Sequence, residues 1–342
     1  MRAYVHRVPG RGAVQEVPTP QPSSGEVRVR VSAAGLNHLD VFARHAVTGP
    51  GIRGHTFPHV SGCDVAGVID AAGPDVEGWR PGDRVVVYPG IGCGSCEFCR
   101  RGDTSSCPAY RIWGEQTWGG LAEYAVAPAD NLMAVPAGFD LGVAAAAPVA
   151  YTTAWQALVT AGALRAGETV LIVGIGGGVA TAALTIARHA GARVLVTSGQ
   201  DRKLERAAAM GAESGVNHAR HPFDTWVRDQ TGGRGVDLVL DSAGAATWRR
   251  SIRSLAPGGR MCVCGATSGD RPDISIRELY QAHRRIIGAP LGGRPTFDTV
   301  MALVFAGALR PAIDAVYPLT TIEHALSSLE ESRQFGKIVI TP

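Results

Sequence analysis

The stretch TVLIVGIGGGVATAALTIARHAGARVLVTS, from Thr169 to Ser198, decides the fold. An apolar, strand-like run leads into the glycine-rich turn Gly174–Gly178, an Ala-rich helical run follows, and a second strand-like run ends the stretch. Glycines suit this turn because the backbone must come close to a pyrophosphate, which the free N–H groups and the dipole of the next helix then stabilise. A glycine pattern alone is weak, but inside a strand–turn–helix–strand unit it predicts a dinucleotide-binding site rather than a structural turn.

The chain around that unit alternates in the same way, with apolar strands and Ala-rich helical stretches from about Thr153 onward. Near-continuous apolar runs separated by helices are typical of buried parallel strands. Right-handed crossovers wind such strands into one open sheet with helices on both faces, so the pattern predicts an α/β, doubly wound parallel sheet of the Rossmann type. The predicted strands are Thr169–Gly174, Arg193–Ser198, Val236–Asp241, Arg260–Gly265 and Arg284–Ala289, with a weaker one near Val216.

The first third of the chain is β-like instead. Val27, Val29 and Val31 alternate with arginines, and the region is dense in Pro and Gly turns, which suit antiparallel strands and loops. At 342 residues the chain is long enough to form two domains of ordinary size. We expect one domain from residues 1–150 with 290–342, whose tail packs back on the first part, and a second from 151–289.

Composition narrows the class of protein. The chain is 45% hydrophobic and 18% charged, with a formal charge of +3 and no basic run, which argues against nucleic-acid binding. Leu141 to Leu164 carries no charge, but it is mostly Ala, Gly and Thr, so a buried segment is favoured over a membrane span. The N-terminus lacks the apolar region of a secretory signal, and we expect a cytoplasmic protein that acts on a small molecule.

The end of the second strand of the dinucleotide unit bears on the cofactor. NAD enzymes usually place an Asp or Glu there, bonded to the ribose 2′-hydroxyl, whereas this chain has Ser198 and Gly199, which leave room for a 2′-phosphate. Lys203 follows closely and is either a phosphate contact or an ordinary solvated helix charge. Asp201 is the rival acid but lies too far along the chain. The pattern favours NADPH over NADH.

The stretch CGSCEFCRRGDTSSC places four thiols at Cys93, Cys96, Cys99 and Cys107. Four cysteines so close together, in a chain with no export signal, indicate a metal site rather than disulfides. Four thiolates close the tetrahedral shell of zinc and leave no position for substrate or water. The spacing therefore predicts a closed metal site in a lobe at about residues 90–110.

The glycine unit, the four-cysteine lobe and the β-rich first domain together resemble the medium-chain dehydrogenase/reductase superfamily over nearly the whole chain. The branch that it resembles is that of the quinone oxidoreductases, with the zinc lobe of the zinc alcohol dehydrogenases retained. The resemblance implies a GroES-like β-barrel domain and a Rossmann domain with the active site between them, and a homodimer joined through the Rossmann sheet edge. It also implies that the four-cysteine site holds one structural zinc per subunit. The motifs that carry it are GLNHLD (35–40), GCDVAGVI (62–69), PGDRVVV (81–87), VDLVLDSAG (236–244), GATSG (265–269) and FGKIVI (335–340).

The same resemblance bears on a second, catalytic zinc. The positions that match the family's three ligands hold Asn37, Cys63 and Val149, and Leu39 stands where the family has a hydroxyl that relays the alcohol proton. We therefore expect no catalytic zinc. A rebuilt metal site remains an alternative, because Cys, His and Asp all ligate zinc. Its candidate ligands are Cys63, Asp64, His38, His45, His55 and His59.

Candidate functional residues follow from the motifs and the resemblance. We expect Asn37, His38 and Cys63 to line the catalytic site, with Asn37 as a donor to a substrate oxygen and His38 as an alternative cofactor contact. Tyr88 and Tyr151 are possible proton donors or plain packing residues. The expected cofactor-binding residues are Thr153, Gly174, Gly176, Gly177, Gly178, Val179, Ser198, Lys203, Gly265, Ala266 and Lys337.

Without a Lewis acid, oxidation of a simple alcohol is difficult because nothing stabilises the alkoxide. Reduction of a conjugated C=C bond is easier, since hydride adds to the β-carbon and hydrogen-bond donors stabilise the charge that builds on the carbonyl oxygen. The sequence therefore favours an NADPH-dependent reductase of an activated C=C bond or a quinone. An alcohol or aldehyde dehydrogenase with a rebuilt metal site and a non-catalytic NADPH-binding protein are the alternatives.

Overall fold

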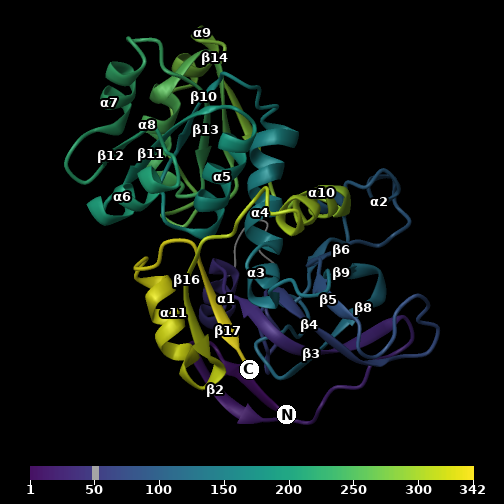
Figure 1. The fold of residues 1–342 in the computed structure, drawn as a ribbon. Coiled ribbons are helices and arrows are strands. Elements are labelled where there is room, and N and C mark those ends of the chain that lie inside the picture. The colour runs from purple at the N-terminus through teal and green to yellow at the C-terminus, as the bar shows by residue number, and fades with distance from the viewer. Residues whose placement is uncertain (48–53) are drawn as a thin grey trace. The chain divides into compact units, whose positions relative to one another are not determined.

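The computed structural model describes residues 1–47 and 54–342, which form two compact units. The first unit contains Met1–Ala150 and Gly293–Pro342, and the second contains Tyr151–Gly292. In Figure 1 the yellow C-terminal elements β16, β17 and α11 lie with the purple N-terminal elements of the first unit. The first unit is therefore built from two segments that are far apart in the sequence.

The first unit is organised around a seven-stranded sheet in the order β16-β17-β3-β4-β5-β9, with β8 paired to β3. All its pairs are antiparallel except β16 with β17. These strands are β3 (Glu26–Gly35), β4 (Asp64–Ala72), β5 (Arg84–Val87), β8 (Tyr124–Pro128), β9 (Leu132–Ala134), β16 (Ile313–Pro318) and β17 (Lys337–Thr341). Two small sheets pair β1 (Arg2–Val8) with β2 (Arg11–Glu16) and β6 (Gly90–Ile91) with β7 (Arg111–Ile112). Its helices are α1 (His38–His45), α2 (Glu97–Arg100), α3 (Leu141–Ala145), α10 (Arg294–Phe305) and α11 (Ile322–Glu330).

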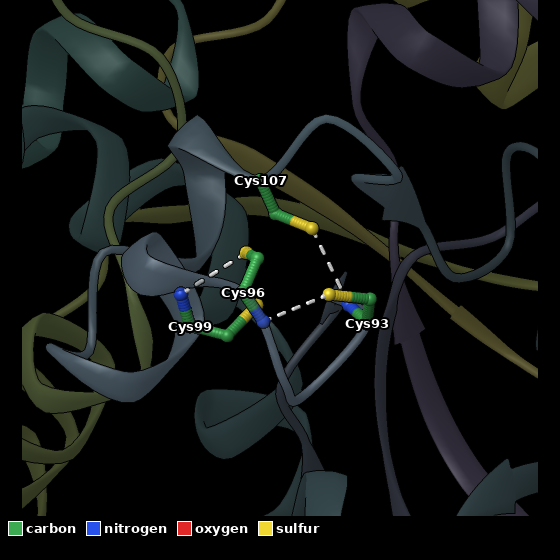
Figure 2. A group of neighbouring side chains, drawn as sticks. All are labelled: Cys93, Cys96, Cys99 and Cys107. Carbon is green, nitrogen blue, oxygen red and sulfur yellow. Dashed lines mark hydrogen bonds between the residues drawn. The ribbon is translucent and has the colours of Figure 1, made fainter.

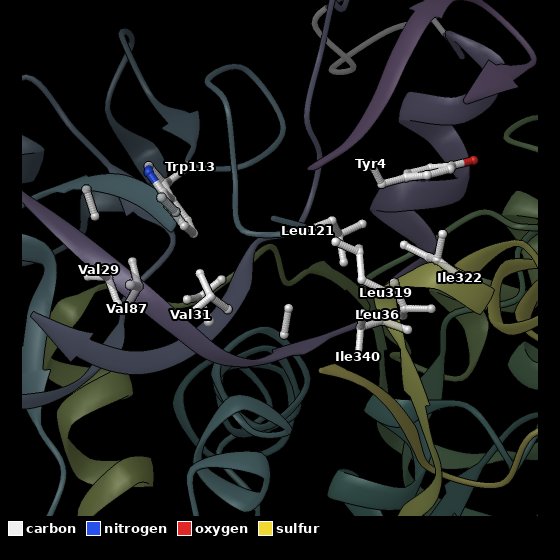
Figure 3. Close-up of a cluster of buried hydrophobic side chains, with 14 of the residues drawn as sticks. Tyr4, Val29, Val31, Leu36, Val87, Trp113, Leu121, Leu319, Ile322 and Ile340 are labelled. Atoms are coloured by element: carbon white, nitrogen blue, oxygen red, sulfur yellow. The ribbon is translucent and has the colours of Figure 1, made fainter. Parts of the chain in front are cut away.

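The alternation seen in the sequence explains the core of this unit. Val27, Val29 and Val31 point to one face of β3 and are buried, as the period of two in a strand requires. They belong to one hydrophobic cluster with residues of the C-terminal segment. Figure 3 shows Leu319, Ile322 and Ile340 of that segment in this cluster. The C-terminal segment thus completes the core of the first unit.

The second unit contains a six-stranded sheet in the order β12-β11-β10-β13-β14-β15, and every pair is parallel. The chain leaves β10 for β11 on one side and returns to β13 on the other, which creates the topological switch point of a Rossmann sheet. The predicted doubly wound fold is confirmed. The strands are β10 (Thr169–Ile172), β11 (Arg193–Ser198), β12 (Ser214–Asn217), β13 (Val236–Asp241), β14 (Leu255–Val263) and β15 (Arg285–Gly288). The helices are α5 (Gly178–His189), α6 (Asp201–Ala209), α7 (Phe223–Gln230), α8 (Ala245–Ser254) and α9 (Ile276–Gln281).

Strand β14 differs most from its prediction, because it begins at Leu255 rather than Arg260. Leu255 already pairs with Val236, and the register then shifts before Arg260 pairs with Leu238. Pro257 and two glycines lie between these pairs, and Gly258 has a φ of +75°. The Pro-Gly-Gly sequence, which reads as a turn, is therefore a bulge within the strand.

The uncharged stretch from Leu141 to Leu164 forms short segments: α3, α4 (Pro148–Trp155) and a π-helical turn (Gln156–Ala161). Pro148 starts α4, the position in a helix where a missing N–H is harmless. Across the described residues, no helix is both long and apolar enough to cross a membrane.

Candidate functional site

The four cysteines of the lobe converge on one point. Their sulfur atoms lie within 4.8 Å of one another. Backbone N–H groups donate to three of these sulfurs: Cys93 to Cys107 Sγ at 3.3 Å, Cys96 to Cys93 Sγ at 3.3 Å, and Cys99 to Cys96 Sγ at 3.5 Å (Figure 2). The last contact caps α2, so the short helix and the metal ligands fix one another.

The thiols of the lobe differ in their electrostatics: backbone N–H groups favour the thiolate form of Cys93, whereas burial and the neighbouring thiols raise the pKa of Cys99 to about 11. The backbone N–H groups of Ser95 and Cys96 hold the pKa of Cys93 at about 6, well below its ordinary value. N–H donors favour the charged form of an acceptor, and thiolate is the ligating form of cysteine. Four convergent sulfurs with N–H donors behind them fit a closed, structural zinc site. The predicted four-cysteine metal site is thus assembled by the fold.

A second polar cluster, the lysine network, consists of Leu36, Asn37, Asp64, Val149 and Lys337. The Lys337 ammonium donates to Asp64 Oδ2, Asn37 Oδ1 and the Leu36 carbonyl oxygen, each at 2.7 Å. An ammonium group has three protons, so these contacts use all of them. Asp64 is fully buried and Lys337 is 3% exposed, which makes this a desolvated ion pair.

The remaining atoms of the lysine network are also paired. Asn37 Nδ2 donates to Asp64 Oδ2 at 2.9 Å and to the Gly35 carbonyl oxygen at 3.3 Å. Asp64 Oδ1 accepts the Val149 N–H at 2.8 Å. The fold therefore brings together Asn37 and Val149, two of the positions that the resemblance matched to zinc ligands. Both amide protons of Asn37 point inward, which argues against its predicted role as a donor to a substrate oxygen.

The same geometry bears on the prediction that Lys337 contacts a cofactor phosphate. Lys337 begins β17 in the first unit, and its three protons already meet oxygens of that unit. No proton remains for a phosphate. The predicted contact had only this motif of the C-terminal segment behind it, and the structure does not favour it.

Asp40 and Cys63 are fully buried beside the lysine network. Asp40 Oδ2 accepts the Asn37 N–H at 2.7 Å, and burial raises the pKa of Asp40 to about 7. Burial, and then the carboxyl groups of Asp40, Glu115 and Asp64, raise the pKa of the Cys63 thiol well above its ordinary value. Cys63 is therefore held as a neutral thiol, which disfavours it as a nucleophile.

His38 is the predicted catalytic residue that keeps free hydrogen-bonding groups. Within residues 1–47 and 54–342, its ring makes no hydrogen bond, whereas its neighbour Asn37 is fully engaged. Burial, and next the nearby Lys337 ammonium, lower the pKa of His38. The imidazole is thus kept neutral, with one N–H donor and one acceptor available.

The glycine turn has the backbone form that its sequence predicted. Gly174 and Gly176 have φ angles of +75° and +138°, which other residues rarely adopt. A Cβ placed on Gly176 would lie 2.9 Å from Lys203 Nζ, so the lysine side chain folds back against the turn. Lys203 is 5% exposed, which rules out the solvated helix charge. Gly177 caps α5, and Gly178 and Val179 form its first turn.

Beside the end of β11 lies a residue that the sequence analysis missed, His218, which follows β12. Its Nδ1 lies 3.1 Å from Thr197 Oγ1, and a Cβ on Gly199 would lie 3.3 Å from its Nε2. The imidazole therefore faces the Ser198-Gly199 position that was predicted to accept a 2′-phosphate. The signal was available, because His218 follows the end of β12 and neighbouring parallel strands end at one edge of the sheet.

Asp201, the rival acid for the ribose, is engaged elsewhere. Its Oδ2 lies 2.8 Å from a guanidinium nitrogen of Arg220, and its Oδ1 accepts a hydrogen bond from Asn217 Nδ2 at 2.6 Å. These contacts hold it within α6 and the loop after β12. The structure thus leaves Ser198 as the side chain at the end of β11, buried at 3% exposure.

The remaining predicted residues either follow a strand at the carboxyl edge of the parallel sheet or are buried among other side chains. Gly265 and Ala266 follow β14 next to the loop after β13: a Cβ on Gly265 would lie 2.7 Å from the Ser242 carbonyl oxygen. Thr153 is 6% exposed within α4. Tyr88 and Tyr151 are almost fully buried, and burial raises the pKa of both phenols, which favours packing over proton donation.

Comparisons with known proteins agree with this architecture. The model of the alcohol dehydrogenase GroES-like domain matches residues 23–137, and that of zinc-binding dehydrogenases matches residues 178–306. A crotonyl-CoA reductase of Streptomyces collinus is 29% identical over 95% of this chain and 80% of its own length. A quinone oxidoreductase of Homo sapiens is 29% identical over 95% of this chain and 92% of its own.

A solved structure titled as an NAD-dependent alcohol dehydrogenase is 40% identical, with a TM-score of 0.94 over 100% of both chains. An alcohol dehydrogenase of Geobacillus stearothermophilus is 30% identical over 96% of this chain and 95% of its own length, so among such relatives reductases and alcohol dehydrogenases lie at similar distance. Its GroES-like unit, its Rossmann-type unit and its four-cysteine lobe, which fits a structural zinc, are those of one family. The chain belongs to the medium-chain dehydrogenase/reductase superfamily and is an oxidoreductase of that family.

Proposed function

We propose that this protein is an NADPH-dependent reductase of activated C=C bonds, in enones or enoyl compounds, or of quinones, and that its zinc is structural. The observation that carries the proposal is the lysine network. At the positions matched to a catalytic zinc, Asn37 and Val149 direct their polar groups to Asp64, and Lys337 neutralises that carboxylate. Cys63, the third matched position, is fully buried, as is the carboxylate that Lys337 neutralises. These residues do not fit a divalent metal.

The reaction then needs neutral donors for the charge on the acceptor oxygen. The reduced nicotinamide, when bound, supplies hydride to the β-carbon, and the electron pair of the C=C bond moves toward the carbonyl oxygen. The neutral His38 donates a hydrogen bond to that oxygen and stabilises the enolate. A proton from solvent completes the α-carbon. His38 itself needs no change in charge at any point.

The preference for NADPH is supported by the end of β11. A carboxylate there would repel a 2′-phosphate, but the position holds Ser198, and Lys203 folds over the glycine turn nearby. His218 adds a further side chain that faces Gly199. We propose that Ser198, Lys203 and His218 bind the 2′-phosphate and that the turn Gly174–Gly178 with Val179 binds the pyrophosphate. Thr153, Gly265 and Ala266 are proposed to line the nicotinamide.

A homodimer is the assembly that the second unit supports. Strand β15 ends its sheet and has an unpaired edge in the described chain. On the helix before it, Ile276 is 73% exposed and Tyr280 is 61% exposed. An open strand edge beside exposed apolar side chains favours pairing with a second copy.

The alternative, an alcohol dehydrogenase, is favoured by the 40% identity to the solved structure of that title. One experiment separates it from the reductase: NADPH and NADH oxidation are assayed with enones, enoyl thioesters, quinones and aldehydes, and zinc is counted in the same sample. The proposal expects NADPH-dependent reduction of enones or quinones at one zinc per chain. Turnover that is confined to aldehydes and lost on addition of chelators would support the alcohol dehydrogenase. NADPH binding without any turnover would support a non-catalytic role.

Two variants test the residues. Ser198→Asp should shift the kcat/KM ratio toward NADH by more than about tenfold, since a carboxylate repels the 2′-phosphate and accepts the 2′-hydroxyl. His38→Gln should lower kcat about 10²- to 10³-fold with little change in KM for NADPH. His324→Gln, on the exposed side of α11, is the control. Equal kcat values for His38→Gln and the control would exclude His38 as the donor.

A further inference from the structure

His6 and His59 form a cross-strand pair in the first unit. The His6 N–H donates to the His59 carbonyl oxygen at 2.8 Å, and the His59 N–H donates to the His6 carbonyl oxygen at 2.9 Å. Residues that exchange both hydrogen bonds lie directly opposite one another, with side chains on the same face and Cβ atoms about 5 Å apart. The two imidazoles are therefore neighbours because of the backbone itself.

A third imidazole adjoins the pair. The His55 ring meets the His59 ring edge-on, with centroids 5.3 Å apart and planes at 60°. His6 is fully buried and His59 is 3% exposed. We refer to His6, His55 and His59 as the histidine cluster.

The ring nitrogens of the histidine cluster lack hydrogen bonds within the described chain. These nitrogens are both of His6, both of His55 and Nε2 of His59. Buried polar groups are nearly always paired, and leaving one unpaired destabilises the fold. Burial is the main cause that lowers the pKa of His6 and of His59, each to about 4, so both rings are neutral. Neutral imidazole is the form that ligates metals.

The charged groups that face the histidine cluster tolerate a cation. Arg44 of α1 lies near His6, but its guanidinium pairs with two carboxylates of α11: Glu323 at 3.0 Å and Glu330 at 3.7 Å. Glu330 also lies 3.0 Å from the ring of His45. One guanidinium with two carboxylates leaves one net negative charge beside the rings, since His45 is charged only when protonated.

We propose that His6, His55 and His59 bind a divalent transition-metal ion, as a second metal site in addition to the four-cysteine lobe. Three imidazoles suit zinc, copper or nickel, and they leave a position open to water or another ligand. In the described chain only the four thiols already lie within ligand distance of one another. The imidazoles reach one ion by turning about χ2, a torsion with broad freedom in histidine. The site does not depend on the proposed reaction.

The test is cobalt titration of the full-length protein with zinc already bound in the lobe, followed by spectroscopy and by metal analysis after gel filtration. The expected result is one further equivalent of Co²⁺ with the weak d–d bands of nitrogen and oxygen ligands and no thiolate charge-transfer band. His6→Asn and His59→Asn should each weaken this binding more than about tenfold, since even outer-shell partners of metals contribute ten- to hundred-fold. His324→Asn is the control.

His55→Asn separates loss of the metal site from loss of folding. His55 is less buried than the other two members, so this variant should fold and still bind cobalt more weakly. Cys96→Ser should remove the zinc of the lobe and leave the cobalt site intact. The proposal is overturned if no further equivalent binds, or if the three histidine variants bind cobalt as tightly as the control. Because the readout is metal stoichiometry, these results are independent of which substrate the enzyme reduces.

Discussion

The four-cysteine lobe and the lysine network neutralise negative charge in opposite ways. In the lobe, four thiols converge within 4.8 Å, and backbone N–H groups donate to three of their sulfurs. In the lysine network, one carboxylate is neutralised by an ammonium group 2.7 Å away. The lobe therefore requires a cation from solution, whereas the network carries its cation on its own chain.

This difference shows which part of the molecule depends on metal. A closed set of thiolates gains its stability from the ion that it binds. A buried lysine–carboxylate pair gains its stability from geometry and loses it when either partner is removed. Of these two regions, only the lobe should therefore respond to metal removal, and only the network should respond to substitution of Lys337.

The largest expected effect separates the two regions directly. Cys96→Ser removes one thiolate but keeps an oxygen that can cap α2, so the protein should lose about one equivalent of zinc per chain, given the roughly 10–16 kcal/mol that structural zinc supplies in small domains. Metal analysis measures the loss, and trypsin should then cut at the exposed Arg100 and Arg101. Cys264→Ser, outside the lobe, should keep its zinc. Retention of zinc by Cys96→Ser would contradict the assignment of the lobe.

The next effect concerns the lysine network. Lys337→Met leaves the buried Asp64 carboxylate without its cation, which should lower the free energy of unfolding by about 3–5 kcal/mol. Urea unfolding measures this loss, and the zinc content should stay unchanged. The double variant Asp64→Asn, Lys337→Met should be more stable than Lys337→Met, because it removes the unpaired charge. Equal stability of Lys337→Met and the natural protein would show that the pair is not an ion pair.

The pH dependence of stability tests the surroundings of the lysine network, through the buried Asp40 beside it. Burial raises the pKa of Asp40 from 3.8 to about 7, so the folded protein holds this proton more tightly than the unfolded chain. The stability that neutral Asp40 contributes is fully present below about pH 4, falls as the pH rises and is gone above about pH 7. Over this window the natural protein should lose on the order of 4 kcal/mol relative to Asp40→Asn.

Unfolding by urea at several pH values compares the two proteins. Asparagine keeps the acceptor for the Asn37 N–H, which isolates the effect of the charge. The thiols of the lobe titrate alike in the natural protein and in Asp40→Asn. Their contribution therefore cancels when the free energies of unfolding of the two proteins are subtracted. Parallel stability curves between pH 4 and pH 8 would mean that Asp40 is ionised in the folded state.

The smallest effect lies in the lobe. The Ser95 hydroxyl lies 3.7 Å from Cys93 Sγ and helps to lower the pKa of that thiol. Ser95→Ala leaves the backbone donors in place, so zinc affinity should fall by about tenfold or less. Competition with a chromophoric chelator measures it. Ser105→Ala, whose hydroxyl donates to Asp103, is the matched control, and equal affinities for the two variants would remove Ser95 from the lobe's electrostatics.

Much of the fold was predictable because its signals are local. The glycine turn, the alternating valines of β3 and the cysteine spacing each lie within a short stretch, and periodicity or spacing alone decides their structure. The bulge in β14 was missed because Pro-Gly-Gly indicates a turn equally well. His218 was missed because its relation to Gly199 depends on the pairing of β11 with β12.

The lysine network was beyond the reach of sequence reasoning for a different reason. Lys337 Nζ meets Leu36 and Asp64, partners that lie 301 and 273 residues away in the chain. The contact exists because β17 pairs with β3, and β3 with β4. The motif around Lys337 holds no information on which neighbouring strands supply oxygens to its ammonium group.

The two-segment construction of the first unit has a consequence for its synthesis. The ribosome makes residues 1–150 first, but Leu319, Ile338 and Ile340, which complete their core, emerge only after the whole second unit. The second unit can fold during translation, since all its strands lie in one continuous segment. The N-terminal part must meanwhile keep its unfinished sheet from pairing with other nascent chains. Chaperone dependence in the cell should therefore be concentrated in that waiting period.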